Sequence, residues 1–574
     1  MLSAVERCVD EVRETRRESL DLSRIPFDDP KTFESIQAAE TTGVFQIESR
    51  AQMSMLPRTR PANLDDLTVQ VALVRPGPIQ GGAVHPYIER LKRRREDPGF
   101  KAPYEHPLLK DVLEYTLGTI VFQEQVIEVA IALAGFSAAQ ADSLRRAMSR
   151  KRSEQAIQDH HDRFIAGAVK KEVPEAVAER VWEQIQGFSG FGFPRAHSAA
   201  FGLLAYQSAW LRVHRPQEFL CALLNEQPMG FYPPDALVHE AQRRGVQVVG
   251  PDANRSRVLC HVETIEGELS VRIGLGYVKG VRKEEMESLL SERERSGDYA
   301  GIADLASRSG AGRDGLERLA WAGALDSLVR GGQLEDVPAL AKRAENVGSL
   351  LGGRREALWE AGGVSAGTGH AAGLQMALPL EPPQPPELKP LGDWERLIAD
   401  YRSIGITLDA HPLGLMRDDL DAETRSSAGL EGVENGATVA VAGFVVARQR
   451  PGTANGIVFM LLEDELGTIN LIVPPPVYER CRAAVRAAPL VRALGRLERH
   501  EGTTNIVVSE VNELSIPNAL AQRGRGDDAS KSTRSPGRST PSRRQRTPCR
   551  QLREHAVVEL RAAAPEAHSW GRRR

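Results

Sequence analysis

Apolar residues recur at three- and four-residue steps through much of the first part of the chain, and this spacing predicts amphipathic helices. The clearest helices are expected over residues 1–19, 32–39, 125–134 and 199–213. A short apolar run over residues 44–47 predicts a strand. One face of the first helix is expected to be buried, and it holds Leu2, Val5, Val9 and Val12. This part of the chain is therefore predicted to be mostly helical.

The pattern changes to alternation between Thr438 and Glu513, where apolar and polar residues follow one another in strand-like stretches. A helix is expected among them over residues 477–488. This order of elements resembles an OB-fold, a small barrel that typically binds single-stranded nucleic acid. Aromatic residues are scarce there, and base stacking on the barrel is expected to be weak. The three of them are Phe444, Phe459 and Tyr478.

Length and composition narrow the class of protein. A chain of 574 residues is too long for one core, and 41% hydrophobic with 26% charged residues is typical of soluble globular proteins. No apolar run approaches the ~20 residues of a membrane helix, and the charged N-terminus disfavours export, so a cytoplasmic location is expected. Five cysteines without a CxxC pair disfavour a zinc site or disulfide framework. The net charge of −3 does not indicate whether the chain binds nucleic acid, so local patches of charge must be considered instead.

The stretch over residues 187–219 carries the strongest candidate chemistry. Glycines and a proline open it and demand turns. Arg195 and His197 follow, and Ser198 is the expected N-cap of the helix over 199–213. A positively charged loop that opens onto a helix N-terminus is suited to bind an anion. The alternative is an ordinary loop–helix junction with a structural histidine.

Two groups of cations lie upstream of this stretch. Arg75 stands directly before Pro76-Gly77-Pro78, a rigid turn that suits a phosphate contact or a buried ion pair. Five cations then fall within eight residues: Arg145, Arg146, Arg150, Lys151 and Arg152. Arginine grips phosphate oxygens with two N–H groups at once, although a solvated helix face would also explain the run. The neighbouring His160 and His161 are expected to point to different faces, so they are not predicted to share a metal.

These motifs resemble one known family, the bacterial C-family DNA polymerases. GFGFPRAHSAAFGLLAYQSAWLRVHRPQEF, ETTGVFQIES, VRPGP and RRAMSRK are similar to parts of their fingers domain, and VALVRPGPIQGGAVHPYI and QPMGFY are similar to the error-prone branch. The resemblance implies contacts with the phosphates of a nucleotide for Arg75, Arg145, Arg146, Arg195 and His197. It implies contacts with the DNA backbone for Arg150, Lys151 and Arg152.

Residues 271–293 predict a strand, a hairpin over 278–281 and a helix from Arg282. This arrangement resembles a helix-hairpin-helix element, whose backbone N–H groups hold a DNA phosphate without reading bases. Lys279, Gly280 and Arg282 are therefore expected at the DNA backbone. Arg282 takes the place of the usual second glycine, which questions a tight hairpin.

A linker rich in Gly, Ala and Pro is predicted over residues 352–389. It contains a hexapeptide that resembles the bacterial sliding-clamp binding motif. The residues expected to dock on the clamp are Gln375, Met376, Leu378, Pro379 and Leu380. A disordered segment that places a few side chains in a groove is a known recognition mode.

Together these features predict a multidomain α+β protein with mostly helical fingers, a helix-hairpin-helix domain, a C-terminal OB-fold β-barrel and a disordered basic tail. The expected boundaries are 1–238 for the fingers, 239–350 for the hairpin domain, 351–395 for the linker, 396–518 for the OB-fold and 519–574 for the tail.

The two carboxylate motifs of the family's catalytic palm, PDxDxD and a later Asp, do not occur in this sequence. The chain is therefore expected to be the C-terminal half of an error-prone DNA polymerase, with no catalytic residue and no metal ligand of its own. The resemblance implies Mg²⁺ in the complete enzyme, and DNA, dNTPs, the sliding clamp, a separate N-terminal half and translesion accessory proteins as partners. A non-catalytic protein that binds DNA and the clamp is the alternative. An RNA-binding module built on the OB-fold is a third possibility, against which the fingers motifs argue.

Overall fold

The computed structural model describes residues 1–74, 84–149, 154–187, 193–329, 353–365, 386, 388–451, 454–500, 502–514, 564 and 568–570. Contacts divide the chain into two compact units. The helical unit comprises residues 21–215 and 500–503, and the mixed unit comprises 1–20, 216–499 and 504–574. Within the described ranges, every helix is too short or too polar to span a bilayer.

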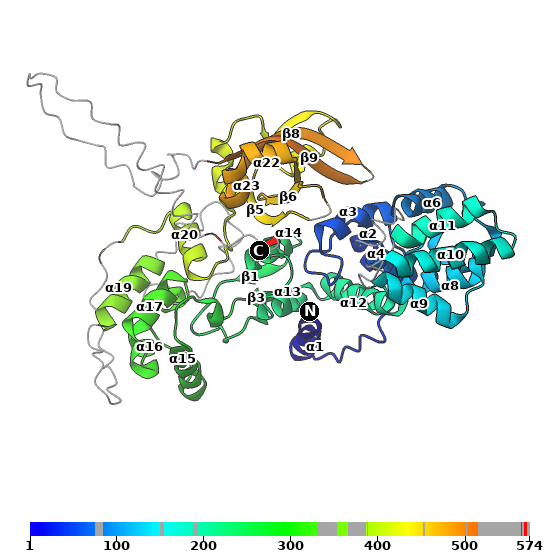
Figure 1. The fold of residues 1–574 in the computed structure, drawn as a ribbon. Helices are drawn as coiled ribbons and strands as arrows, with labels where there is room; N and C mark the ends of the chain where they lie inside the picture. The colour runs from blue at the N-terminus through cyan, green and yellow to red at the C-terminus, as the bar shows by residue number, and fades with distance from the viewer. Residues whose placement is uncertain are drawn as a thin grey trace, which may run out of the picture. The chain divides into compact units, whose positions relative to one another are not determined.

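The helical unit is built from α2 (Pro30–Gln37), α3 (Arg50–Thr59), α4 (Leu64–Leu73), α6 (Val84–Glu96), η1 (Pro107–Leu109), α7 (Lys110–Leu113), η2 (Glu114–Thr116), α8 (Gln123–Ala134), α9 (Ala138–Ser149), α10 (Glu154–Lys170), α11 (Glu175–Gly187) and α12 (Arg195–His214). Helices α8 to α11 lie side by side (Figure 1). The core between them includes the buried Leu133, Phe164 and Trp182. Gly167 lets α10 approach α8, because a Cβ there would lie 2.1 Å from the Ala134 carbonyl oxygen. Gly135, at φ 68°, follows the last residue of α8, so this helix ends where the sequence predicts.

Two local expectations for the helical unit are wrong. Residues 44–47 form turns rather than a strand. Val44 and Ile47 are both buried, and Gln46 between them has φ 64°. The apolar side chains of this run are therefore buried by a turn and not by a paired strand. Helix α12 begins at Arg195, one turn earlier than expected, and Ser198 is not its cap. Ser198 lies inside the first turn, where its Oγ donates a hydrogen bond to the Thr68 carbonyl at 2.5 Å.

The mixed unit begins with α1 (Leu2–Arg16), α13 (Pro216–Asn225) and α14 (Pro234–Arg243), followed by β1 (Gln247–Val249), β2 (His261–Ile265) and β3 (Glu268–Arg272). The strands form a sheet in the order β1-β3-β2, with β1 parallel and β2 antiparallel to β3. The buried face of α1 holds Ala4, Val5, Cys8 and Val12. Leu2 is 66% exposed, contrary to the prediction, because it is the first residue of the helix and lies at its open end.

The hairpin region contains η3 (Leu275–Tyr277), α15 (Lys283–Ser296), α16 (Ile302–Ser309), α17 (Arg313–Trp321), η4 (Asp326–Leu328), α19 (Gly353–Ser365) and α20 (Asp393–Ser403). Arg282, at the start of α15, has φ −71° and ψ 145°. That conformation suits any residue, so the hairpin does not need glycine at this position. Gly280, by contrast, has φ 81°, a value that favours glycine.

The barrel region contains α21 (Pro412–Met416), η6 (Arg417–Asp419), β4 (Thr424–Arg425), η7 (Ala428–Leu430), β5 (Thr438–Gln449), β6 (Val458–Glu463), β7 (Thr468–Val473), α22 (Pro475–Arg480), α23 (Arg482–Ala487), β8 (Leu490–His500), β9 (Thr503–Glu513) and β10 (His568–Trp570). Five strands close in the order β5-β6-β7-β9-β8, because β8 pairs again with β5. The core of this barrel includes the fully buried Val441, Leu462 and Val491. The predicted fold, with helical fingers, a helix-hairpin-helix element and an OB-type barrel, is confirmed. The predicted basic tail lies almost entirely outside the described residues. The boundaries of the five predicted domains stay predictions.

Candidate nucleic-acid interface

The first turn of α12 presents Arg195 and His197, both exposed. Its position is fixed by the start of α8, because the Gln123 N–H donates to the Phe193 carbonyl at 3.2 Å and Phe122 pairs with Phe193. The backbone N–H of Arg195 donates to a carboxylate oxygen of Glu124 at 3.0 Å. The turn that the sequence predicts as an anion site is thus held at the start of α8 and already contacts one carboxylate.

Aromatic rings hold the two side chains of this turn in place. The Arg195 guanidinium lies over the Tyr115 ring, 4.2 Å from its centre, a favourable cation–π contact. The Tyr115 hydroxyl donates to the Asp65 carbonyl at 2.9 Å, and burial together with the Asp65 charge raises its pKa to about 12. The His197 ring packs edge-on against Phe201, at 4.1 Å between ring centres. The turn is therefore rigid, with its polar groups at the surface.

Helix α12 packs closely on α4 beneath this turn. Gly202 lies against Thr68, since a Cβ would come within 3.3 Å of the Thr68 hydroxyl. The Ser198 hydroxyl uses the Thr68 carbonyl as its acceptor. Ser198 therefore anchors the turn from below rather than capping it. Sequence spacing could not distinguish these roles, because serine serves both.

Arg145 and Arg146 lie on α9 and share one carboxylate that the sequence reasoning missed. Asp142 accepts from the Arg145 guanidinium at 2.8 and 3.0 Å, and Arg146 lies 2.7 Å from its other oxygen. The hydrogen bond from Arg145 lowers the pKa of Asp142. The spacings of three and four residues on a helix were the signal that could have revealed this group. Asp142 holds the two arginines together, with the Arg146 side chain 73% exposed and the Arg145 side chain half-buried.

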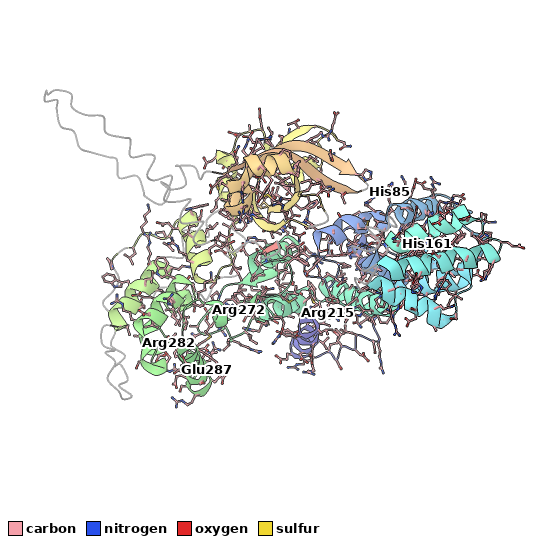
Figure 2. The ribbon with its side chains drawn as sticks, viewed as in Figure 1. His85, His161, Arg215, Arg272, Arg282 and Glu287 are labelled. Carbon is pink, nitrogen blue, oxygen red and sulfur yellow. The ribbon has the colours of Figure 1, made fainter. Side chains whose placement is uncertain are left out.

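Several predicted residues lie outside the described part of the chain. They are Arg75, Arg150, Lys151 and Arg152, and the clamp-motif residues Gln375, Met376, Leu378, Pro379 and Leu380. His160 and His161 are described and contact different helices, as adjacent helical residues do. His160 lies 3.4 Å from the Ser143 hydroxyl on α9, and His161, labelled in Figure 2, lies 3.0 Å from Glu179 on α11.

The predicted hairpin residues lie together in the mixed unit. The Lys279 backbone N–H donates to the Ser403 carbonyl and its Nζ donates to the Tyr401 carbonyl, both at 2.8 Å. Burial lowers the pKa of Lys279. Arg282, labelled in Figure 2, donates to Glu285 at 2.6 Å. Lys279 thus fixes the hairpin to α20, whereas Arg282 is held at the start of α15 by a carboxylate.

The barrel offers few aromatic rings to a nucleic acid. Phe444 and Tyr478 are buried, and the Arg450 guanidinium covers the Tyr478 ring at 4.7 Å. A cavity of about 330 Å³ lies beside Asn470, Arg499 and Thr504. The Arg499 guanidinium already donates to the backbone carbonyls of Leu430, Glu431 and Val433. The surface therefore supports the expectation that base stacking on this barrel is weak.

A buried group of charges joins α14 to strand β6. The His239 Nε2 lies 2.9 Å from the Thr407 hydroxyl and 3.5 Å from Asp235, and its Nδ1 lies 3.4 Å from Glu463. Arg243 pairs with Glu463 at 2.8 Å. Burial opposes the charged form of His239, but the carboxylates of Asp235 and Glu463 outweigh it and raise its pKa to about 9. His239 is therefore a buried cation between two anions.

His239, His411 and Glu463 have ligand atoms within 4.8 Å of one another and are the one group of this kind among the described residues. Their hydrogen bonds do not suit a metal ion. The Nδ1 of His411 accepts the Leu413 N–H at 3.2 Å, so its neutral ring carries the proton on Nε2 and has no lone pair there. Glu463 is already shared by His239 and Arg243. Burial lowers the pKa of His411 to about 3.

Comparison with known proteins finds two matching family models and several similar proteins. Residues 1–172 match the family described as the bacterial DNA polymerase III alpha subunit finger domain, and residues 245–333 match the helix-hairpin-helix motif. The chain is 42% identical over 518 residues to the error-prone DNA polymerase of Pseudomonas fluorescens (strain Pf0-1), with 90% of this chain and 47% of the relative covered.

Two further relatives carry the same name. The protein of Burkholderia pseudomallei (strain K96243) is 40% identical over 528 residues, covering 90% of this chain and 47% of the relative. That of Anaeromyxobacter sp. (strain K) is 40% identical over 514 residues, covering 88% and 42%. The chain thus spans about half the length of the curated relatives it matches.

The chain thus combines a match to a polymerase finger domain, a helix-hairpin-helix motif and a closed five-stranded barrel. The resemblance predicted from the motifs is confirmed: the chain is similar to bacterial DNA polymerase III alpha subunits in its fingers and to proteins named error-prone DNA polymerase over about 90% of its length.

Proposed function

We propose that this chain is the part of an error-prone DNA polymerase that binds DNA and the phosphates of the incoming nucleotide. One observation carries the proposal: α8, which lies within the match to the polymerase finger domain, packs on α9 and is hydrogen-bonded to the residue before the first turn of α12, which presents Arg195 and His197. The exposed cations of this unit and the N-terminal dipole of α12 suit a triphosphate.

Arg145 and Arg146 fit the same role. Their guanidinium groups share Asp142 in an ion pair that water can reach, and a phosphate can replace such a weakly held carboxylate. Phosphate contacts carry no base information, so all four dNTPs are expected to bind alike.

Catalysis in the complete polymerase is proposed to depend on Mg²⁺ held by palm carboxylates. Neither carboxylate motif of the palm occurs in this sequence. We therefore propose that the chain contributes positioning and charge stabilisation and that nucleotide addition needs a palm from elsewhere.

The purified chain should bind primed DNA and incorporate no nucleotide. Fluorescence anisotropy with a labelled primer–template at 50 to 300 mM salt is the test, and log K should fall steeply with log salt because counterions are released. A primer-extension assay with Mg²⁺ and all four dNTPs runs beside it. The absence of salt-sensitive binding would refute the DNA-binding role, and template-dependent extension above a mock preparation would refute the need for another palm.

Sliding-clamp binding is proposed through residues 375–380, on the sequence resemblance alone. Gln375→Ala with Leu378→Ala should abolish retention of the clamp in a pull-down while leaving DNA affinity unchanged, because such motifs concentrate binding energy in few anchors. Gln384→Ala with Leu388→Ala, nearby in the sequence, is the matched control. Equal retention by the two double variants would contradict the assignment.

The alternative function is a non-catalytic protein that binds DNA and the clamp. The missing carboxylate motifs favour it. The two functions differ in one result: a palm-containing polypeptide added in trans should restore extension only if this chain serves a polymerase.

A further inference from the structure

A cavity of about 500 Å³ lies beside the hairpin in the mixed unit, between α17, α19 and α20. This volume is in the range of sites that hold small ligands. The cavity is lined chiefly by cationic and tryptophan side chains. They are Lys279, Arg318, Arg355 and Arg402, with Trp321 and Trp394.

The lining is strongly cationic. Four cations face one carboxylate, that of Glu395, so the formal charge is 4 − 1 = +3. Arg355 takes up this carboxylate, with its Nη2 3.1 Å from Glu395. Arg318 is exposed and has no hydrogen-bond or ion-pair partner among the described residues. Such a cavity favours an anionic ligand.

The two tryptophans add the features that an aromatic ligand needs. Trp321 is 42% exposed and lies one turn after Arg318 on α17, so both side chains share a face. Trp394 is only 7% exposed, and its Nε1–H has no acceptor among the described residues. A buried indole N–H normally finds a partner, so this donor points to an acceptor supplied by a ligand.

The cavity and the hairpin form one continuous surface. Lys279 belongs to both, and its two hydrogen bonds to the carbonyls of Tyr401 and Ser403 fix the hairpin on α20. The Arg318 guanidinium lies at Gly280, where a Cβ would be 2.6 Å from its Nη1. A DNA strand whose phosphate lies at the hairpin would therefore bring a neighbouring nucleotide to the cavity.

We propose that this cavity holds one unpaired nucleotide of single-stranded DNA, with its base against Trp321 and its phosphate at Arg318 and Lys279. A base acceptor atom would satisfy the Trp394 indole. A paired base has both faces stacked and its edge occupied, so a duplex does not offer it to a concave site. The proposal rests on the DNA binding proposed above and adds a preference for the unpaired strand.

The test uses fluorescence anisotropy to compare two cavity variants on α17 with control variants on α17 and α19. Trp321→Ala and Arg318→Ala should each weaken binding of a labelled oligo-dT by roughly tenfold, while a blunt duplex binds within about twofold of the parent. Trp359→Ala and Arg313→Ala are the matched controls, because Trp359 and Arg313 are exposed residues of α19 and α17 outside the cavity. Both controls should bind oligo-dT like the parent.

Photo-cross-linking with 5-iododeoxyuridine in the oligonucleotide locates the base directly. Peptide mapping should recover the adduct on Trp321 or Trp394. Equal oligo-dT affinity for Trp321→Ala and Trp359→Ala, or an adduct confined to the barrel, would overturn the proposal. Displacement of oligo-dT by poly-glutamate from the parent but not from Arg318→Ala would also overturn it, in favour of an acidic peptide. A parent that binds duplex but shows none of these differences refutes the cavity assignment alone, whereas a parent that binds neither DNA refutes the proposed function.

Discussion

Two groups of arginine and carboxylate side chains in this protein have the same chemistry and opposite surroundings. On α14 and β6, Arg243 and Glu463 are joined by His239 and Asp235, and both carboxylates are almost completely buried. On α9, Arg145 and Arg146 share Asp142 at the surface. A buried charge that loses its partner cannot turn to water, whereas an exposed one can exchange its partner for a ligand phosphate. Burial, rather than residue type, thus separates charges that hold the fold from charges that can bind.

The strongest test of the buried group is Glu463→Gln. It leaves His239 and Arg243 without their shared anion, and we expect a loss of about 3–5 kcal/mol in local stability. Amide hydrogen exchange in β6 and α14 measures this free energy even if the two units unfold separately. Glu479→Gln, at an exposed position of α22, is the control and should change little. Equal protection in the two variants would mean that the buried pair contributes nothing.

The pH dependence of the same group follows from His239. Its pKa rises from about 6.5 in the unfolded chain to about 9 in the fold, so its contribution is complete below pH 6.5 and is lost as pH rises through 9. The groups that face it are Asp235, Glu463, Arg243 and His411.

We expect local stability at β6 to fall by on the order of 3 kcal/mol between pH 6 and pH 9.5, in exchange data corrected for intrinsic rates. His239→Gln should flatten this slope. A variant with the slope of the parent would show that another group titrates.

Replacement of Arg145 and Arg146 by Ala tests the exposed group. The double variant should fold normally but bind every dNTP in the DNA complex at least roughly tenfold more weakly, because charge-assisted contacts are lost. Arg93→Ala with Arg94→Ala on α6 is the matched control. Titration of each dNTP into the DNA-bound chain is the measurement, and a defect confined to one base would place the nucleotide elsewhere.

The smallest expected effect comes from Asp142→Asn. Removing the competing carboxylate should tighten dNTP binding by about two- to fivefold, since an exposed ion pair is weak. Isothermal titration with the same DNA complex decides it. Weaker binding would instead assign Asp142 a positioning role for the two arginines.

Much of the fold could be predicted from pattern alone. Strands β7 and β8 alternate between buried and more exposed positions, as expected of a strand with one buried face, whereas β5 is buried along most of its length. Gly135 ends α8 because it adopts a positive φ. The prediction of a strand over residues 44–47 is wrong because a short apolar run is compatible with a buried turn as well as with a strand. The prediction that Ser198 caps its helix is wrong because the acceptor of its hydroxyl, the Thr68 carbonyl, is 130 residues away in sequence.

The sequence by itself determined the family resemblance, the order of the elements and the positions of Arg145, Arg146, Arg195 and His197 as candidate phosphate ligands. These follow from local spacing and from motifs that are continuous along the chain. Only the tertiary structure decided which charges are buried together, since His239, Thr407 and Glu463 come from three distant segments. It alone brought Lys279, Arg318 and Trp394 around one cavity. Long-range packing sets burial, and burial decides whether a charged side chain supports the fold or remains available to a ligand.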